Sequence, residues 1–271
     1  MIRTLTLLFA ATVAIGPVEA AGERARFLEG SSAQSLTPEE LSEEIKGYLA
    51  ADAIAAAAAA VPAPPPLDSA VDKADVLQAR QMNAHAKPER WERAQLDDAS
   101  VYDRFSQQLG VVPDRRRLPA FVRLLNRVSG DALAAAGEAK KRYPRPRPFQ
   151  RFHVARVCGQ AVAPKPEASP SGGTSYTSGH AAVSWAAALV MVEASPQSAQ
   201  AIIARAVDYG YSRVVCGLHF PSDIDAGQLV ATSVIDKLFA LPAFRRDFQC
   251  AKRELQSVLA GMRAEDLPAC Q

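Results

Sequence analysis

The chain has 271 residues, of which 48% are hydrophobic, and this is enough apolar material for one substantial core. Its formal net charge of +2 excludes a strong overall electrostatic attraction to nucleic acid or to an anionic membrane surface. The sharpest local excess of positive charge lies at residues 140–147, so an anion could still be attracted there.

The first 20 residues have the pattern of a secretory signal peptide. Arg3 gives a short positive start, and the apolar stretch from Leu5 to Gly16 is too short to span a bilayer. Small residues at Val18 and Ala20 fit a cleavage site. No later apolar run reaches the ~20 residues that a spanning helix needs. The sequence therefore predicts a periplasmic or secreted protein without stable membrane insertion.

A helical extension is predicted between this leader and the main domain. The segment Thr37–Glu40 has the composition of a helix start, and an alanine-rich tract could continue the helix to Ala60. The proline-rich residues 61–67 would end the helix and impose an extended connection. We expect residues 21–66 to form this extension with its linker, and residues 67–271 to form the main domain.

Helical patterns dominate the main domain. Ser195 and Ser222 are of a residue type typical of N-caps, and each is predicted to begin a helix. Few segments show the alternation of apolar and polar residues that a strand would have. We find no internal repeat, and the domain is therefore predicted to be all-α. The clearest single helix carries an apolar stripe with spacings of three and four. Its members are Phe121, Leu125, Val128, Ala132, Ala136 and Ala139.

Export changes the interpretation of the four cysteines. An even number in an oxidising compartment predicts two disulfides, for which four cysteines allow three pairings, and free buried thiols are the alternative. Because no Cys-x-x-Cys occurs, a zinc knuckle or a thioredoxin-like motif is not expected. The four residues are Cys158, Cys216, Cys250 and Cys270.

Three segments outside these elements carry chemically useful side chains. The first, KKRYPRPRP, is basic and proline-rich; the second is TSGH; and the third, SRVVCGLHFPSD, contains a histidine four residues before an aspartate. Each one alone is common in proteins that have no active site. The relevant residues are Lys140, Arg147, Ser178, Gly179, His180, Arg213, His219 and Asp223.

Taken together, these residues supply what phosphoryl transfer needs. Three cations could surround one anion, and a hydroxyl with a backbone N–H at a helix start could donate further hydrogen bonds to it. Two histidines offer a nucleophile and a proton donor, and Asp223 could fix which ring nitrogen of His219 faces the anion. Positioning and charge stabilisation are the main requirements of this reaction.

In this order and spacing, the segments resemble the three-part signature of the type 2 phosphatidic acid phosphatase superfamily: Lys-x6-Arg-Pro, Pro-Ser-Gly-His and Ser-Arg-x5-His-x3-Asp. Within it, the stretch GYSRVVCGLHFPSDIDAG is most similar to the secreted class A bacterial non-specific acid phosphatases. The resemblance covers roughly residues 60–250. It implies a helical bundle of the phosphatidic acid phosphatase and vanadium chloroperoxidase type.

The resemblance also implies a role for each matching residue. His219 would be the nucleophile that forms a phosphohistidine, Asp223 would orient it, and His180 would protonate the leaving oxygen and later activate water. Substrates would be small phosphomonoesters, and neither a metal nor another cofactor would be required. The phosphate would be held by Lys140, Arg147, Ser178, Gly179 and Arg213.

One position departs from the family pattern, since Thr177 stands where the signature has proline. Threonine lacks the fixed φ of proline, so the rigidity of this loop is in question, whereas the reaction type is not. His85 and His153 match no motif, and we assign them no role.

The convergence of the segments also suggests the disulfide pairing. Cys158 follows the first segment and Cys216 lies within the third, so a bridge between them would tie together two segments that meet at one phosphate. This leaves Cys250 and Cys270 to close the C-terminal tail.

Other functions are compatible with parts of this pattern. A lipid phosphatase or a vanadium-dependent haloperoxidase would use the same pocket, and an exported phosphate-binding protein without catalysis would need only the cations. A serine hydrolase would leave three cations unexplained and lacks the Gly-x-Ser-x-Gly motif. The sequence is compatible with a homo-oligomer, and it leaves the preferred phosphomonoester and the purpose of the extension open.

Overall fold

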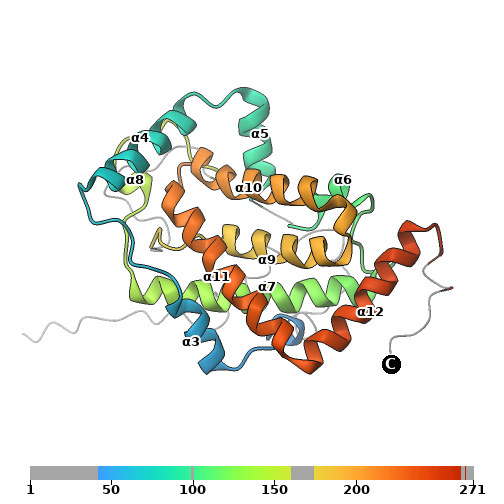
Figure 1. Cartoon of the computed structure of the whole chain (residues 1–271). Coiled ribbons are helices and arrows are strands. Elements are labelled where there is room, and N and C mark those ends of the chain that lie inside the picture. The colour runs from blue at the N-terminus through green and yellow to red at the C-terminus, as the bar shows by residue number, and fades with distance from the viewer. Residues whose placement is uncertain (1–41, 99–100, 160–173, 264–265, 267–271) are drawn as a thin grey trace, which may run out of the picture.

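The computed structural model describes residues 42–98, 101–159, 174–263 and 266 (Figure 1). No β-strand occurs in these ranges, and the predicted all-α class is confirmed. The predicted leader at residues 1–20 and the predicted helix start at residues 37–40 lie outside the described residues. The helices, in chain order, are α3 (Ala51–Ala59), α4 (Ala70–Ala84), α5 (Pro88–Leu96), α6 (Ser106–Leu109), α7 (Pro119–Arg142), α8 (Pro148–Arg151), α9 (Gly179–Ala194), α10 (Ala199–Val215), α11 (Pro221–Ala240) and α12 (Pro242–Leu259).

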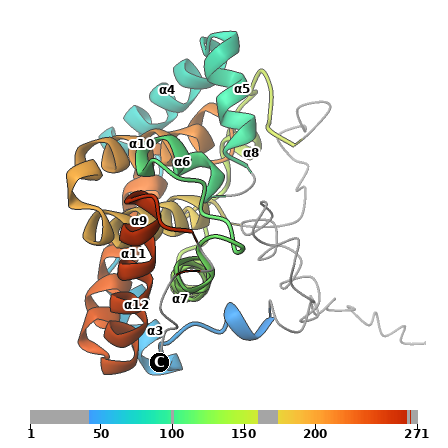
Figure 2. The same cartoon turned by 90° about the vertical axis from the view of Figure 1, so that its right-hand side faces the viewer.

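Helix α9 lies at the centre of the bundle and packs against α7, α10 and α11 (Figures 1 and 2). Alanine and valine occupy most of its positions, and these small side chains are buried on nearly every side of the helix. Helix α7 buries the whole apolar stripe that begins at Phe121, as predicted. Among the described helices, none combines the length and the apolarity needed to cross a bilayer.

A continuous helix up to Ala60 was expected, and this part of the prediction is wrong. A short helical segment at residues 42–44 is separated from α3 by a bend at Gly47, whose φ is +76°. The carboxylate of Asp131 accepts the backbone N–H groups of Tyr48 (2.9 Å) and Leu49 (3.1 Å), which a continuous helix would have bonded internally. A Cβ atom at Gly47 would lie 2.1 Å from Oδ1 of Asp131, so the bend needs glycine.

Two predicted helix starts also differ. Ser195 ends α9 and precedes a short 3₁₀ turn, and α10 begins only at Ala199. Helix α11 begins earlier than expected, because Pro221 already has helical geometry and the Asp223 carboxylate accepts the N–H of Phe220 (2.7 Å). Ser222 is therefore inside the helix and is not the N-cap.

The proline-rich linker has no regular secondary structure over residues 62–66 and joins α3 to α4, as predicted. Its backbone is held near the bundle, because the Tyr176 hydroxyl donates to the carbonyl of Pro62 (2.7 Å). Helix α3 packs against α7 and α11, so the described part of the extension shares the main core. The division of the chain at residue 66 stays a prediction.

Candidate active site

The three sequence segments meet where helix ends converge. Lys140 lies in the last turn of α7 and Arg147 directly precedes α8, while Arg213 lies in the last turn of α10. Ser178, Gly179 and His180 begin α9, and His219 and Asp223 flank the start of α11. The packing of α7, α10 and α11 around α9 therefore brings all eight predicted residues to one region of the bundle.

His219 is buried and lies between a carboxylate and a guanidinium. Its Nδ1 is 3.4 Å from Oδ2 of Asp223, within ion-pair range although outside hydrogen-bond geometry, and its Nε2 is 3.3 Å from Nη1 of Arg147. Burial lowers the pKa of His219 well below its ordinary value, and the charges of Arg147 and Lys140 lower it further, while Asp223 opposes them. A neutral ring with its proton on Nδ1 would leave the Nε2 lone pair facing the cations.

Asp223 is completely buried and receives several donors. Its Oδ2 accepts the N–H of Phe220 (2.7 Å) and the hydroxyl of Ser175, and its Oδ1 accepts Nη1 of Arg145 (2.7 Å). Burial alone would raise the pKa of this carboxyl, but the neighbouring His219 and Arg145 outweigh it and lower the pKa to about 2. The carboxylate is therefore ionised except in strongly acidic solution.

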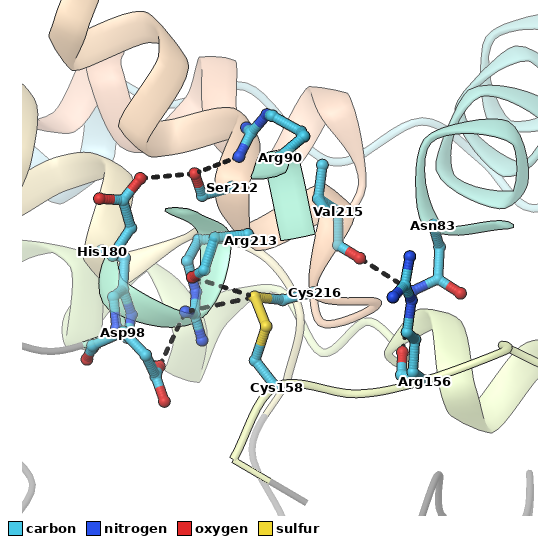
Figure 3. The surroundings of a disulfide bond; sticks show 12 residues. Asn83, Arg90, Asp98, Arg156, Cys158, His180, Ser212, Arg213, Val215 and Cys216 are labelled. Atoms are coloured by element: carbon cyan, nitrogen blue, oxygen red, sulfur yellow. Dashed lines mark hydrogen bonds and ion pairs between the residues drawn. A yellow bond between two sulfur atoms is a disulfide. The ribbon is translucent and has the colours of Figure 1, made fainter. Parts of the chain in front are cut away.

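His180 shares a carboxylate with Arg213. Oδ1 of Asp98, just after the end of α5, lies 2.7 Å from Nη1 of Arg213 and 3.4 Å from Nε2 of His180 (Figure 3). Burial lowers the pKa of His180 to about 4, with a further contribution from the charge of Arg213 that Asp98 partly offsets. Nε of Arg213 is buried and has no hydrogen-bond partner among the described residues.

Asp98 was missed at the sequence level because it belongs to no motif. Its neighbour Asp97 is buried, pairs with Arg205 and accepts the hydroxyl of Ser212 (2.6 Å), which fastens the end of α5 to α10. Because Asp97 is fixed in this way, the adjacent Asp98 lies within ion-pair distance of Arg213. No signal in the sequence distinguishes these two aspartates from a solvated helix end.

The loop before α9 supplies backbone groups to the site. Nζ of Lys140 donates to the carbonyl of Thr174 (2.9 Å), and the N–H of Ser178 donates to the carbonyl of Asp223 (2.9 Å). Ser178 caps α9, because its Oγ accepts the N–H of Ala181 (3.3 Å). Thr177, the residue before Ser178, is buried, and the peptide bond between Tyr176 and Thr177 is cis.

The predicted bridge between Cys158 and Cys216 is present. Cys216 lies between Arg213 and His219 in the chain, and its Sγ is 3.8 Å from Nη1 of Arg213 (Figure 3). The bridge thus joins the segment after α8 to the segment that carries three site residues, Arg213, His219 and Asp223. Cys250 is also disulfide-bonded, but Cys270 lies outside the described residues, so the second pairing stays a prediction.

Arg145, within the first segment, was also missed. It is buried and binds Asp223 together with two aspartates of α4, at Asp72 and Asp75. The alternation of arginine and proline in this segment is typical of a solvated loop, and only the packing of α4 shows otherwise. Within the described ranges, no group of three or more His, Cys, Asp or Glu side chains is arranged to hold a metal ion.

Comparison with known proteins agrees with this arrangement. Residues 124–246, which include every predicted catalytic and phosphate-binding residue, match the PAP2 superfamily. The chain is 34% identical over 201 residues to a non-specific acid phosphatase of Providencia stuartii, covering 72% of this chain and 79% of that protein. It is 34% identical over 184 residues to a non-specific acid phosphatase of Salmonella typhimurium (66% and 72% covered). It is also 31% identical over 179 residues to an acid phosphatase of Zymomonas mobilis (66% of each).

Proposed function

The chain belongs to the PAP2 superfamily as an acid phosphatase of the class A bacterial type, and we propose that it hydrolyses phosphomonoesters through a phosphohistidine at His219. The observation that carries the proposal is the environment of His219. A buried, ionised Asp223 lies beside Nδ1, and Arg147 lies beside Nε2. The nitrogen that would attack phosphorus therefore faces the cation that would bind the phosphate oxygens.

In the first step, Nε2 of His219 attacks phosphorus and the bond from phosphorus to the leaving oxygen breaks. His180 gives its proton to that oxygen, so an alcohol leaves. In the second step, His180 takes a proton from water as the water oxygen attacks the phosphohistidine, which releases inorganic phosphate and restores His219. Lys140, Arg147 and Arg213 would balance the charge of the transferred group.

The pKa values of the two histidines support activity at acidic pH. His219 stays neutral at low pH because its pKa is held well below its ordinary value. The pKa of His180 is about 4 without ligand, and a bound phosphate ester brings negative charge opposite Arg213, which would raise it. Substrate binding would thus load His180 with the proton that the leaving group needs.

Metal independence and export form the finer part of this proposal. The positive charge of the pocket comes from side chains, and phosphoryl transfer in such a pocket needs no divalent ion to neutralise the phosphate. The leader pattern at residues 1–20 and the buried bridge at Cys158 and Cys216 support a periplasmic or secreted enzyme.

The proposal is tested by trapping the intermediate. We expect labelled phenyl phosphate, quenched in the steady state, to leave acid-labile phosphate on the protein and on a His153→Ala control, whose site histidines are intact. His219→Ala should bind no label, and EDTA should leave turnover unchanged. Label on the His219→Ala protein would refute the assigned nucleophile, and a divalent ion that restores EDTA-inactivated enzyme would refute metal independence.

The same assays separate the alternative functions. A non-catalytic binding protein would release no phosphate from any ester. A lipid phosphatase would prefer phosphatidic acid in mixed micelles to soluble monoesters, and a haloperoxidase would oxidise halide with peroxide after addition of vanadate. The relatives are named acid phosphatases, which favours soluble phosphomonoesters.

A further inference from the structure

Arg145 is a buried guanidinium that the proposed chemistry does not use. Its side chain is 3% exposed, and it lies in the connection between α7 and α8. Nη1 donates to Oδ1 of Asp223 (2.7 Å) and to Oγ of Ser222 (2.8 Å). Nη2 donates to Oδ2 of Asp75 (2.9 Å) and to Oδ1 of Asp72 (3.2 Å). One side chain therefore joins α4 to the carboxylate beside His219.

The charges of this cluster are nearly balanced. Asp72, Asp75 and Asp223 contribute three negative charges, and Arg145 and Arg151 contribute two positive ones. Arg151 binds the outer end of the cluster, because both of its terminal nitrogens bind Asp72 at 2.7 Å, and its guanidinium carbon lies 5.2 Å from the ring centroid of Phe220. Arg145 is the cation that reaches Asp223, so its removal would leave this carboxylate without a guanidinium partner.

The geometry at Asp223 indicates what this partner does. Arg145 binds Oδ1, whereas Oδ2, which also accepts the Phe220 N–H and the Ser175 hydroxyl, is the oxygen that lies 3.4 Å from Nδ1 of His219. The planar guanidinium is further fixed against the ring of Phe220, with its carbon 4.3 Å from the ring centroid. A lysine could supply the charge but not the several directed donors of the guanidinium.

We propose that Arg145, anchored by Asp72 and Asp75, is a positioning residue that orients Asp223 toward His219 and keeps it ionised during turnover. The inference rests on the proposed phosphohistidine mechanism, in which Asp223 must hold the proton of His219 on Nδ1. Two of the three carboxylates that bind Arg145 come from α4, which lies before the residues matched by the superfamily. The amino-terminal part of the bundle would thereby help to orient the nucleophile His219, through Arg145 and Asp223.

The pH dependence of activity should reveal this role. Loss of the adjacent Arg145 should raise the pKa of Asp223 by roughly 1–3. Removal of this positive charge should also raise the pKa of His219. Both changes would move the acidic limb of the profile to higher pH. The charged and titratable groups facing Asp223 are Arg145, His219 and Tyr176, and those facing His219 are Arg147, Lys140 and Asp223.

The experiment compares Arg145→Ala and Arg145→Lys with Arg151→Ala, which removes an arginine from the same cluster without touching Asp223. We expect kcat to fall by roughly 10- to 100-fold in both position-145 variants. Losses of this size are typical when a group that orients a metal-binding side chain through a hydrogen bond is removed. KM should change little, and the acidic limb should move upward by about one unit or more. Added guanidinium chloride, but not NaCl, should restore part of the kcat of Arg145→Ala.

A purely structural role would lower the amount of folded enzyme without moving the pH profile. Wild-type kcat and an unmoved acidic limb in folded Arg145→Lys would overturn the proposal, and so would an equal effect of Arg151→Ala.

If neither position-145 variant folds, Asp75→Asn decides. Loss of this anchoring carboxylate should lower kcat with little change in KM, and a wild-type kcat in the folded variant would overturn the proposal. Absence of phosphohistidine in the wild type would instead refute the proposed mechanism, and the response of the pH profile to these variants would still be measurable.

Discussion

Substitution of Asp98 by asparagine should lower the proton affinity of His180 while leaving the shape of the site nearly unchanged. Two unit charges 3.4 Å apart, the distance from Oδ1 of Asp98 to Nε2 of His180, attract by about 1 kcal/mol in water and about 5 kcal/mol near a protein surface. The Asp98 side chain is 38% exposed, so water screens the pair and the lower end applies. A loss of about 1–2 kcal/mol corresponds to about one pKa unit.

Because His180 must be protonated so that the leaving oxygen departs as an alcohol, the alkaline limb of kcat should move to lower pH by about one unit. The shift should be clear for an alkyl phosphate and small for p-nitrophenyl phosphate, whose leaving group needs little protonation. KM should fall, since Arg213 loses its internal carboxylate and binds the phosphate more strongly.

The assay is a kcat profile for both substrates over the acidic and neutral range. Asp208→Asn is the matched control, because Asp208 has a similar exposure of 32% and pairs with Arg90 and Arg205, away from His180. An alkaline limb that stays in place in Asp98→Asn, or that moves equally in Asp208→Asn, would show that Asp98 does not set the pKa of His180.

Three further outcomes are expected. Replacing His180 by alanine should abolish turnover of alkyl phosphates but leave measurable phosphorylation by p-nitrophenyl phosphate, and equal losses on both would contradict its role as an acid. Replacing both Cys158 and Cys216 by serine should lower the free energy of unfolding by about 4 kcal/mol, because the bridge closes a loop with a sequence separation of 58. The urea midpoint should fall accordingly, and an unchanged midpoint would contradict this stabilising role. Gly227→Ala should lower the free energy of unfolding by roughly 1–3 kcal/mol and lower kcat, because the new Cβ would lie 2.6 Å from the carbonyl oxygen of Ser178. The control is Gly137→Ala, whose new Cβ meets no atom within 4 Å and which should raise the free energy of unfolding by about 0.5–1 kcal/mol.

Much of the proposed chemistry could be predicted from the sequence because it depends on residues close together in the chain. His219 and Asp223 are four residues apart across the start of one helix, so local geometry alone brings the carboxylate to the ring. The apolar stripe of α7 likewise follows from helical periodicity. The bridge from Cys158 to Cys216 followed from the requirement that two segments bind one phosphate.

Tertiary structure alone decided which groups surround these residues. Nothing in the order of the chain indicates that Asp98 pairs with Arg213, or that two aspartates of α4 bind Arg145, because each pair is separated by about 70 residues or more and is made only when the helices pack. A buried arginine requires carboxylate partners, but the sequence does not say which ones. The break at Gly47 has the same origin, since Asp131 takes the backbone donors that would otherwise have continued a helix.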